Sequence, residues 1–135
     1  MSTSALVLTL FIAWTLVLLV VMEVVRSYLV LSGRTKSNEF RPDNANLSPF
    51  LQRLARAHAN CIEGLPVFGG LLLIAIATGR TGLTDSLAPW LLLARISQSI
   101  THLVSLSVFA VNIRFFFFFV QLAIAVYWTW ALLVR

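Results

Sequence analysis

Four long apolar stretches occupy nearly all of this chain, and they limit the folds that it can adopt. The first has no charged residue from Ala5 to Met22, and at ~1.5 Å per residue a helix of this length approaches the thickness of a bilayer core. Of the 135 residues, 59% are hydrophobic and 11% are charged, which leaves too few polar side chains to cover a soluble domain. We therefore predict an all-α integral membrane protein, a single four-helix domain over residues 1–135 with helices at about 4–31, 49–78, 87–110 and 115–134.

The distribution of lysine and arginine predicts how these helices lie in the membrane. An up-down-up-down bundle places seven of the ten on the side of loop 32–48 and two on the other side, with Arg95 inside the membrane. The positive-inside rule then puts this loop in the cytoplasm and both termini outside. No basic run alternates with aromatic residues in a polar segment, so the expected partner is membrane lipid and not nucleic acid. The seven are Arg26, Arg34, Lys36, Arg41, Arg53, Arg56 and Arg114.

The second predicted helix carries polar residues into the membrane along one face. Ser48 and Pro49 are typical of a helix start. Arg56, Asn60 and Glu63 follow at i, i+4 and i+7, which places them on one side of a helix. An acid and an amide inside an apolar segment are costly in lipid and must face protein or a water-filled cavity. Two interpretations stay open at this point, a functional site and a buried polar clamp between helices.

The third predicted helix carries a second polar stripe. Arg95, Gln98 and His102 recur at i, i+3 and i+7, so they share one face of an otherwise apolar helix. A predicted turn at residues 112–114 then places Arg114 at the opening of the fourth helix. The predicted topology brings Gln98, His102 and Arg114 to the level of the cytoplasmic half of the second helix, with Arg95 deeper in the membrane.

Positive charge exceeds negative charge where the two stripes converge. Because Glu63 and Arg95 are each too costly to leave unpaired in a membrane, we predict an ion pair between them, within one subunit or across an interface. The other arginines of the region suit an anionic ligand that carries carboxylates. Nearby cations would also favour the thiolate form of a bound thiol. These arginines are Arg34, Arg53, Arg56 and Arg114.

Three features outside the stripes have structural interpretations. Glu23 and Arg26, at i and i+3 near the end of the first helix, are expected to pair with each other; the alternative is that Arg26 reaches into a polar cavity. The phenylalanine run at residues 115–119 is expected to face lipid or a neighbouring helix. Trp128 and Trp130 near the end of the fourth helix are typical of an interfacial aromatic belt.

The second helix contains the motif Arg56-Ala-His-Ala-Asn60-x-x-Glu63-x-x-Pro66, which closely resembles the signature of the MAPEG family, the membrane-associated proteins of eicosanoid and glutathione metabolism. Segments 94–102 and 113–114 resemble the third and fourth helices of that family. The resemblance implies a homotrimer that binds glutathione between adjacent subunits near the cytoplasmic side. It also implies that Arg114 lies beside the glutathione sulfur and stabilises the thiolate. The residues predicted to bind glutathione are Arg34, Arg53, Arg56, Asn60, Glu63, Gln98 and His102.

The sequence departs from the eicosanoid-producing members of that family. Ala59 stands where prostaglandin-synthase-like and leukotriene-synthase-like members tend to carry an arginine, and His102 stands at the place of a glutathione-contacting tyrosine. The phenylalanine run covers the region of another such tyrosine. The resemblance is therefore closer to the general bacterial branch of the family, which implies a bacterial inner membrane and gives no support for eicosanoid specificity.

Two functions follow from these comparisons. The first is a glutathione-dependent transferase or peroxidase that acts on lipophilic electrophiles, with the thiolate stabilised by Arg114. The second is a non-catalytic lipid-binding or accessory subunit of a membrane complex, which the missing tyrosines and Ala59 favour. A channel or transporter has less support, because the hydropathy pattern contains no discontinuous helix pair and no inverted repeat.

Overall fold

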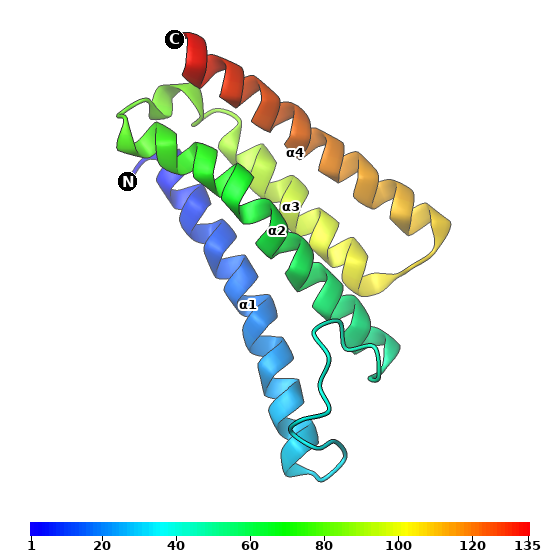
Figure 1. Cartoon of the computed structure of the whole chain (residues 1–135). Coiled ribbons are helices and arrows are strands. Elements are labelled where there is room, and N and C mark those ends of the chain that lie inside the picture. Colours follow the sequence, from blue (N-terminus) through cyan, green and yellow to red (C-terminus); the bar gives the residue numbers. More distant parts are fainter.

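The chain folds into four helices that run alternately up and down (Figure 1). The computed structural model describes every residue from Met1 to Arg135. Its elements are α1 (Thr3–Leu31), α2 (Pro49–Ala77), the 3₁₀ turn η1 (Thr81–Leu83), α3 (Ala88–Val104) and α4 (Val108–Val134). Three of them, α1, α2 and α4, are long and apolar enough to cross a bilayer, whereas α3 has only 17 residues. The predicted all-α four-helix architecture is confirmed.

The helix starts follow local capping chemistry. Ser48 has an extended backbone, and its hydroxyl accepts a hydrogen bond from the backbone N–H of Leu51 at 3.4 Å. Pro49 occupies the first helical position, where the missing N–H costs nothing. The predicted start of this helix is therefore confirmed. α2 then runs without interruption through Pro66 to Ala77.

The boundary between α3 and α4 differs from the prediction. The turn comprises residues 105–107, so the predicted helix end at residue 110 and the predicted turn at 112–114 are wrong. Ser105 is extended, with φ −158° and ψ 153°, and it ends α3. Ser107 caps α4 by accepting a hydrogen bond from the N–H of Ala110 at 3.2 Å. Arg114 consequently lies within the second turn of α4 and is held rigidly by the helix.

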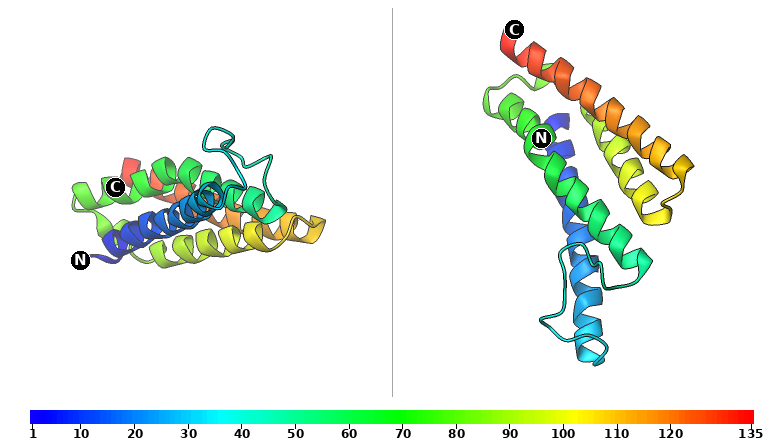
Figure 2. Two further views of the ribbon diagram at one scale, coloured as in Figure 1. Left: turned by 90° about the horizontal axis from the view of Figure 1, so that it is seen from below. Right: turned by 45° about the vertical axis from the view of Figure 1, so that its right-hand side comes forward.

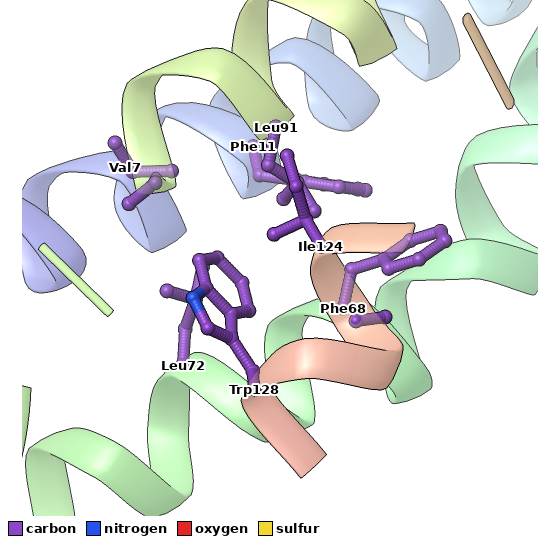
Figure 3. Packing of buried hydrophobic residues seen from close by; sticks show 9 residues of the cluster. Val7, Phe11, Phe68, Leu72, Leu91, Ile124 and Trp128 are labelled. Carbon is purple, nitrogen blue, oxygen red and sulfur yellow. The ribbon is translucent and has the colours of Figure 1, made fainter. Parts of the chain in front are cut away.

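The ends of the chain meet in a core that joins all four helices (Figure 3). Trp128 of α4 is fully buried at its centre, packed among residues of α1, α2 and α3. Its predicted place in an interfacial belt is wrong, because Trp128 shares a helix face with the buried Gln121 and Ile124, whereas Trp130 is exposed. We call this cluster the four-helix core; its buried members are Val7, Phe11, Phe68, Leu72, Ala88, Leu91, Ile124, Ala125 and Trp128.

The end of the bundle near loop 32–48 is built differently. Its apolar cluster takes all of its buried residues from α1 and α2, and the lower end of α1 lies away from α3 and α4 in Figure 1 and in the right-hand view of Figure 2. We call this cluster the two-helix core; its buried members are Leu18, Met22, Leu51, Leu54, Ala55, Ala57 and Cys61. The facing sides of α2, α3 and α4 at this level carry polar side chains instead.

Loop 32–48 is tied to the bundle by Arg26. This side chain donates two hydrogen bonds to Oδ1 of Asn44, at 2.6 and 3.2 Å, and one to the carbonyl oxygen of Arg41 at 3.1 Å. Asn44 is fully buried with φ of 55°, and its amide donates to the carbonyl of Leu51 at 2.8 Å. Arg26 also forms the predicted ion pair with Glu23, at 3.3 Å. The loop therefore has a defined place beside α1 and the start of α2.

Candidate functional site

A pocket of about 300 Å³ lies between α2, α3 and α4 on the polar side of the bundle. Four of its lining residues are polar and come from three helices, and the other three are apolar and come from α4. All four polar residues belong to the set predicted from the sequence. The lining residues are Asn60, Gln98, His102, Val111, Arg114, Phe115 and Phe118.

Arg114 and His102 form the most direct polar contact across this pocket. Nη1 of Arg114 lies 2.6 Å from Nδ1 of His102. A guanidinium group has no hydrogen-bond acceptor, so Arg114 donates and Nδ1 accepts. A neutral His102 then carries its proton on Nε2. Neither Nε2 of His102 nor Nε of Arg114 has a partner, although both atoms are buried.

Gln98 is held by a residue that the sequence interpretation missed. Gln121 of α4 is fully buried, and its Nε2 donates to Oε1 of Gln98 at 2.9 Å and to the carbonyl oxygen of Phe117 at 3.0 Å. A signal for it exists in the sequence: Gln121 is seven residues after Arg114, which places both on one face of α4. The buried amide pair joins α3 to α4 beneath the pocket.

Arg95 is buried behind Asn60. Its Nη1 donates to both the side-chain oxygen and the carbonyl oxygen of Asn60, the second at 3.3 Å. The guanidinium carbon lies 5.6 Å from the ring centre of Phe11 and 5.5 Å from that of Phe68, which are cation–π distances. The carbonyl of Arg95 accepts from Ser99 at 3.0 Å. Arg95 is only 1% exposed, so this charge is stabilised by amide and aromatic groups.

The predicted ion pair between Glu63 and Arg95 does not form within one chain. Glu63 is exposed on α2, and the pair of Arg26 and Glu23 is the one ion pair in the structure. Asn60, one helical turn before Glu63, meets Arg95 in its place. A pairing of Glu63 with Arg95 across a subunit interface stays a prediction.

The other predicted arginines lie outside the pocket of a single chain. Arg53 donates from Nε to the carbonyl oxygen of Leu103 at 3.0 Å, at the end of α3. Arg56 is exposed and lines a separate hollow of about 340 Å³ beside loop 32–48. Arg34 is exposed at the far end of α1. The structure thus brings together Asn60, Gln98, His102 and Arg114. Arg56 lies one helical turn before Asn60 and lines the other hollow.

These observations define a class of protein: a multi-pass membrane protein of four helices with a pocket near one end that is lined by an arginine and neutral polar residues. A family model for the MAPEG family matches residues 4–134, and the chain belongs to this family. Members of the family are typically glutathione transferases or peroxidases, and they generally bind glutathione. No curated protein and no solved structure matches the chain.

Proposed function

We propose that this protein is a glutathione-dependent transferase or peroxidase that acts on lipophilic electrophiles from within the membrane. The observation that carries the proposal is the position of Arg114. Its guanidinium lines the pocket, is oriented by His102 at 2.6 Å, and keeps a buried Nε that no protein group satisfies. A buried cationic donor without a partner favours a pocket that takes an anion.

The residues of the pocket fit glutathione. Its carboxylates and its thiolate are anions, and the lining supplies the Arg114 guanidinium with two neutral amides. When bound, glutathione supplies the thiol whose thiolate form is the nucleophile of the reaction. The contribution of Arg114 is to hold negative charge at the sulfur, since a cation beside a thiol favours its ionised form. His102 keeps the guanidinium aimed at the pocket by accepting from Nη1.

The apolar part of the lining suits the second substrate. Val111, Phe115 and Phe118 lie on α4 and form the apolar side of the pocket. Phe115 is also exposed on the outside of the bundle. A lipophilic electrophile dissolved in the bilayer therefore has an apolar route from lipid to the polar end of the pocket.

A neighbouring copy of the chain would complete the site. Arg56 and Glu63 are exposed on the same face of α2 as Asn60. Arg34 is exposed in loop 32–48, just after the end of α1. These residues are free to bind the parts of glutathione that lie outside one chain's pocket, as expected for a homotrimer with sites between subunits. We further propose a bacterial inner membrane location with loop 32–48 cytoplasmic and both termini outside, because the basic residues concentrate at the loop end.

The experiment is turnover of a generic aryl halide and of a lipid hydroperoxide with glutathione, by the full chain in lipid nanodiscs. We expect Arg114→Ala to lower kcat by about 10²-fold, the typical effect of removing a group that stabilises developing or bound negative charge. Arg135→Ala is the matched control, because Arg135 is exposed at the far end of α4 and does not line the pocket. Absence of both activities in the wild type, or an unchanged rate in Arg114→Ala, would contradict the proposal.

One observation favours a second function. No tyrosine lines the pocket, and three of its seven lining residues are apolar. A non-catalytic subunit that binds lipid would use the same apolar wall without thiol chemistry. Calorimetry with glutathione distinguishes the two: no binding at millimolar concentration, together with co-purification with a larger membrane complex, would favour the non-catalytic subunit.

A further inference from the structure

The hydrogen bonds behind the pocket assign an orientation to each polar group that lines it. We infer that Arg95 and Gln121 are positioning residues, which turn the amide nitrogens of Asn60 and Gln98 into the pocket, so that its polar lining offers hydrogen-bond donors alone and selects an anionic group. Neither Arg95 nor Gln121 lines the pocket itself. This inference rests on the proposed function and gives the reason why the pocket prefers an anionic ligand.

The orientation of Asn60 follows from the chemistry of arginine. Nη1 of Arg95 contacts Oδ1 of Asn60, and a guanidinium can only donate. The amide of Asn60 must therefore direct its oxygen toward Arg95. Its nitrogen has no partner within the chain and is the group that Asn60 can offer to the pocket.

The orientation of Gln98 follows from two bonds of Gln121. The group of Gln121 that lies 3.0 Å from the carbonyl oxygen of Phe117 must be its nitrogen, because a carbonyl only accepts. The same nitrogen lies 2.9 Å from Gln98, so Gln98 presents its oxygen to Gln121. The amide nitrogen of Gln98 is thereby left for the pocket. Gln121 is fully buried between the helices, which holds this arrangement in place.

The contact between His102 and Arg114 likewise leaves only donor atoms for the pocket. Nδ1 of His102 accepts from Arg114, so in the neutral ring Nε2 is the atom that carries the proton. The acceptor atoms of Asn60, Gln98 and His102 thus each already accept a hydrogen bond from another protein group. A thiolate, carboxylate or sulfonate accepts from such donors, whereas an alcohol or a neutral thiol leaves its own hydrogen without an acceptor.

The test compares matched ligands on the full chain in nanodiscs of neutral lipid, by calorimetry. Two pairs are used: glutathione sulfonate against S-methylglutathione, and a short alkyl sulfonate against the alcohol of the same length. We expect each sulfonate to bind at least about tenfold more tightly than the ligand of its pair with a thioether or hydroxyl in that place, because donors that face an uncharged group and stay unpaired are costly. Equal measurable affinity within either pair would overturn the inference, and measurable binding of the glutathione derivatives would leave glutathione binding intact.

The positioning role of Gln121 is tested by Gln121→Met, which keeps the size of the side chain and removes its donor. We expect the preference for the sulfonate to fall by about three- to tenfold, because Gln98 can then turn its oxygen into the pocket. In a Gln98→Leu background the same substitution should change the preference less than twofold, since Gln121 acts through Gln98. Equal effects of Gln121→Met in both backgrounds would show a merely structural role.

The two proposals fail in different ways. If the alkyl sulfonate is preferred and neither glutathione derivative binds, the donor lining stands and the glutathione function is wrong. If both glutathione derivatives bind equally well, glutathione binding stands and the inference is wrong. If the wild type binds no sulfonate of either kind, the inference is overturned together with the proposed anion site.

Discussion

The two ends of the bundle contrast in what they bury. At the end where the chain termini meet, all four helices contribute apolar side chains to one core around Trp128. At the end near loop 32–48, the buried apolar residues come from α1 and α2 alone, and the space toward α3 and α4 holds Arg95, Gln98 and Gln121 with the pocket beside them. Packing that joins the helices and polar groups that bind a ligand are thus separated along the helix axes.

This separation has a physical reason. Between helices in lipid, close packing supplies most of the association energy, so a dense four-helix contact is the most effective way to hold the bundle together. Buried polar groups contribute little net stability even when each has a partner, because their desolvation offsets much of the gain. We therefore expect substitutions at the two ends to differ: at the apolar end they change the free energy of unfolding, and at the polar end they change binding and turnover.

Trp128→Ala is expected to cause the largest loss in the free energy of unfolding. It removes the largest fully buried side chain and leaves a cavity where four helices meet. We expect a loss of about 3 kcal/mol in the free energy of unfolding, at the low end for such changes because lipid leaves mainly the packing contribution. Unfolding with sodium dodecyl sulfate in mixed micelles measures it. Trp130→Ala, at an exposed position two residues away, is the control. Equal effects of the two substitutions would contradict the role of this core.

Gly64→Ala tests whether ligand binding at the polar end depends on the position of Arg95. A Cβ at position 64 would lie 2.7 Å from Nη2 of Arg95 and 3.1 Å from the ring of Phe68. Arg95 must then move and release Asn60, so we expect about tenfold weaker glutathione sulfonate binding with a stability loss of about 1–2 kcal/mol. Gly70→Ala is the matched control, because its Cβ would meet no atom within 4 Å. Unchanged binding in Gly64→Ala would show that the position of Arg95 is unimportant for the pocket.

The sequence alone predicts the helices and the polar residues of the pocket, but it does not predict every helix boundary. Helix number, order and class follow from hydropathy, and the pocket residues Asn60, Gln98, His102 and Arg114 follow from helical spacing once the topology is known. The boundary between α3 and α4 did not follow, because Asn112 resembles a turn residue, whereas the cap at Ser107 sets the start of α4.

Two further features depended on three-dimensional packing. Trp128 looks interfacial by its place near a helix end, and only the arrangement of four helices buries it. Glu63 and Arg95 were matched by charge, but Asn60 lies closer to Arg95, so an amide and two aromatic rings surround the cation instead. A one-dimensional pattern identifies which side chains need partners, and it does not determine which partner is within reach.

Ser4→Ala tests a buried polar contact at the apolar end. The hydroxyl of Ser4 lies 2.6 Å from that of Thr84 and 2.6 Å from Oδ1 of Asp85, and it ties the start of α1 to the segment before α3. We expect a loss of about 1 kcal/mol in the free energy of unfolding, the net value of such hydrogen bonds. Thr9→Ala is the control, because the Thr9 hydroxyl donates only to its own helix, at the carbonyl of Ala5. A loss as large as that of Trp128→Ala would mean that polar contacts stabilise this end as much as apolar packing does.

Phe115→Ala is expected to leave stability almost unchanged and to alter substrate use at the polar end. Phe115 is 58% exposed, so its removal creates no closed cavity, and we expect a change below about 0.5 kcal/mol in the free energy of unfolding. Because its ring forms part of the apolar wall of the pocket, KM for a lipophilic electrophile should rise about fivefold while KM for glutathione stays within about twofold. Phe116→Ala is a close control, since Phe116 is similarly exposed but does not line the pocket. If the two variants show the same kinetics, the phenylalanine run contacts lipid alone and α4 provides no apolar wall for the second substrate.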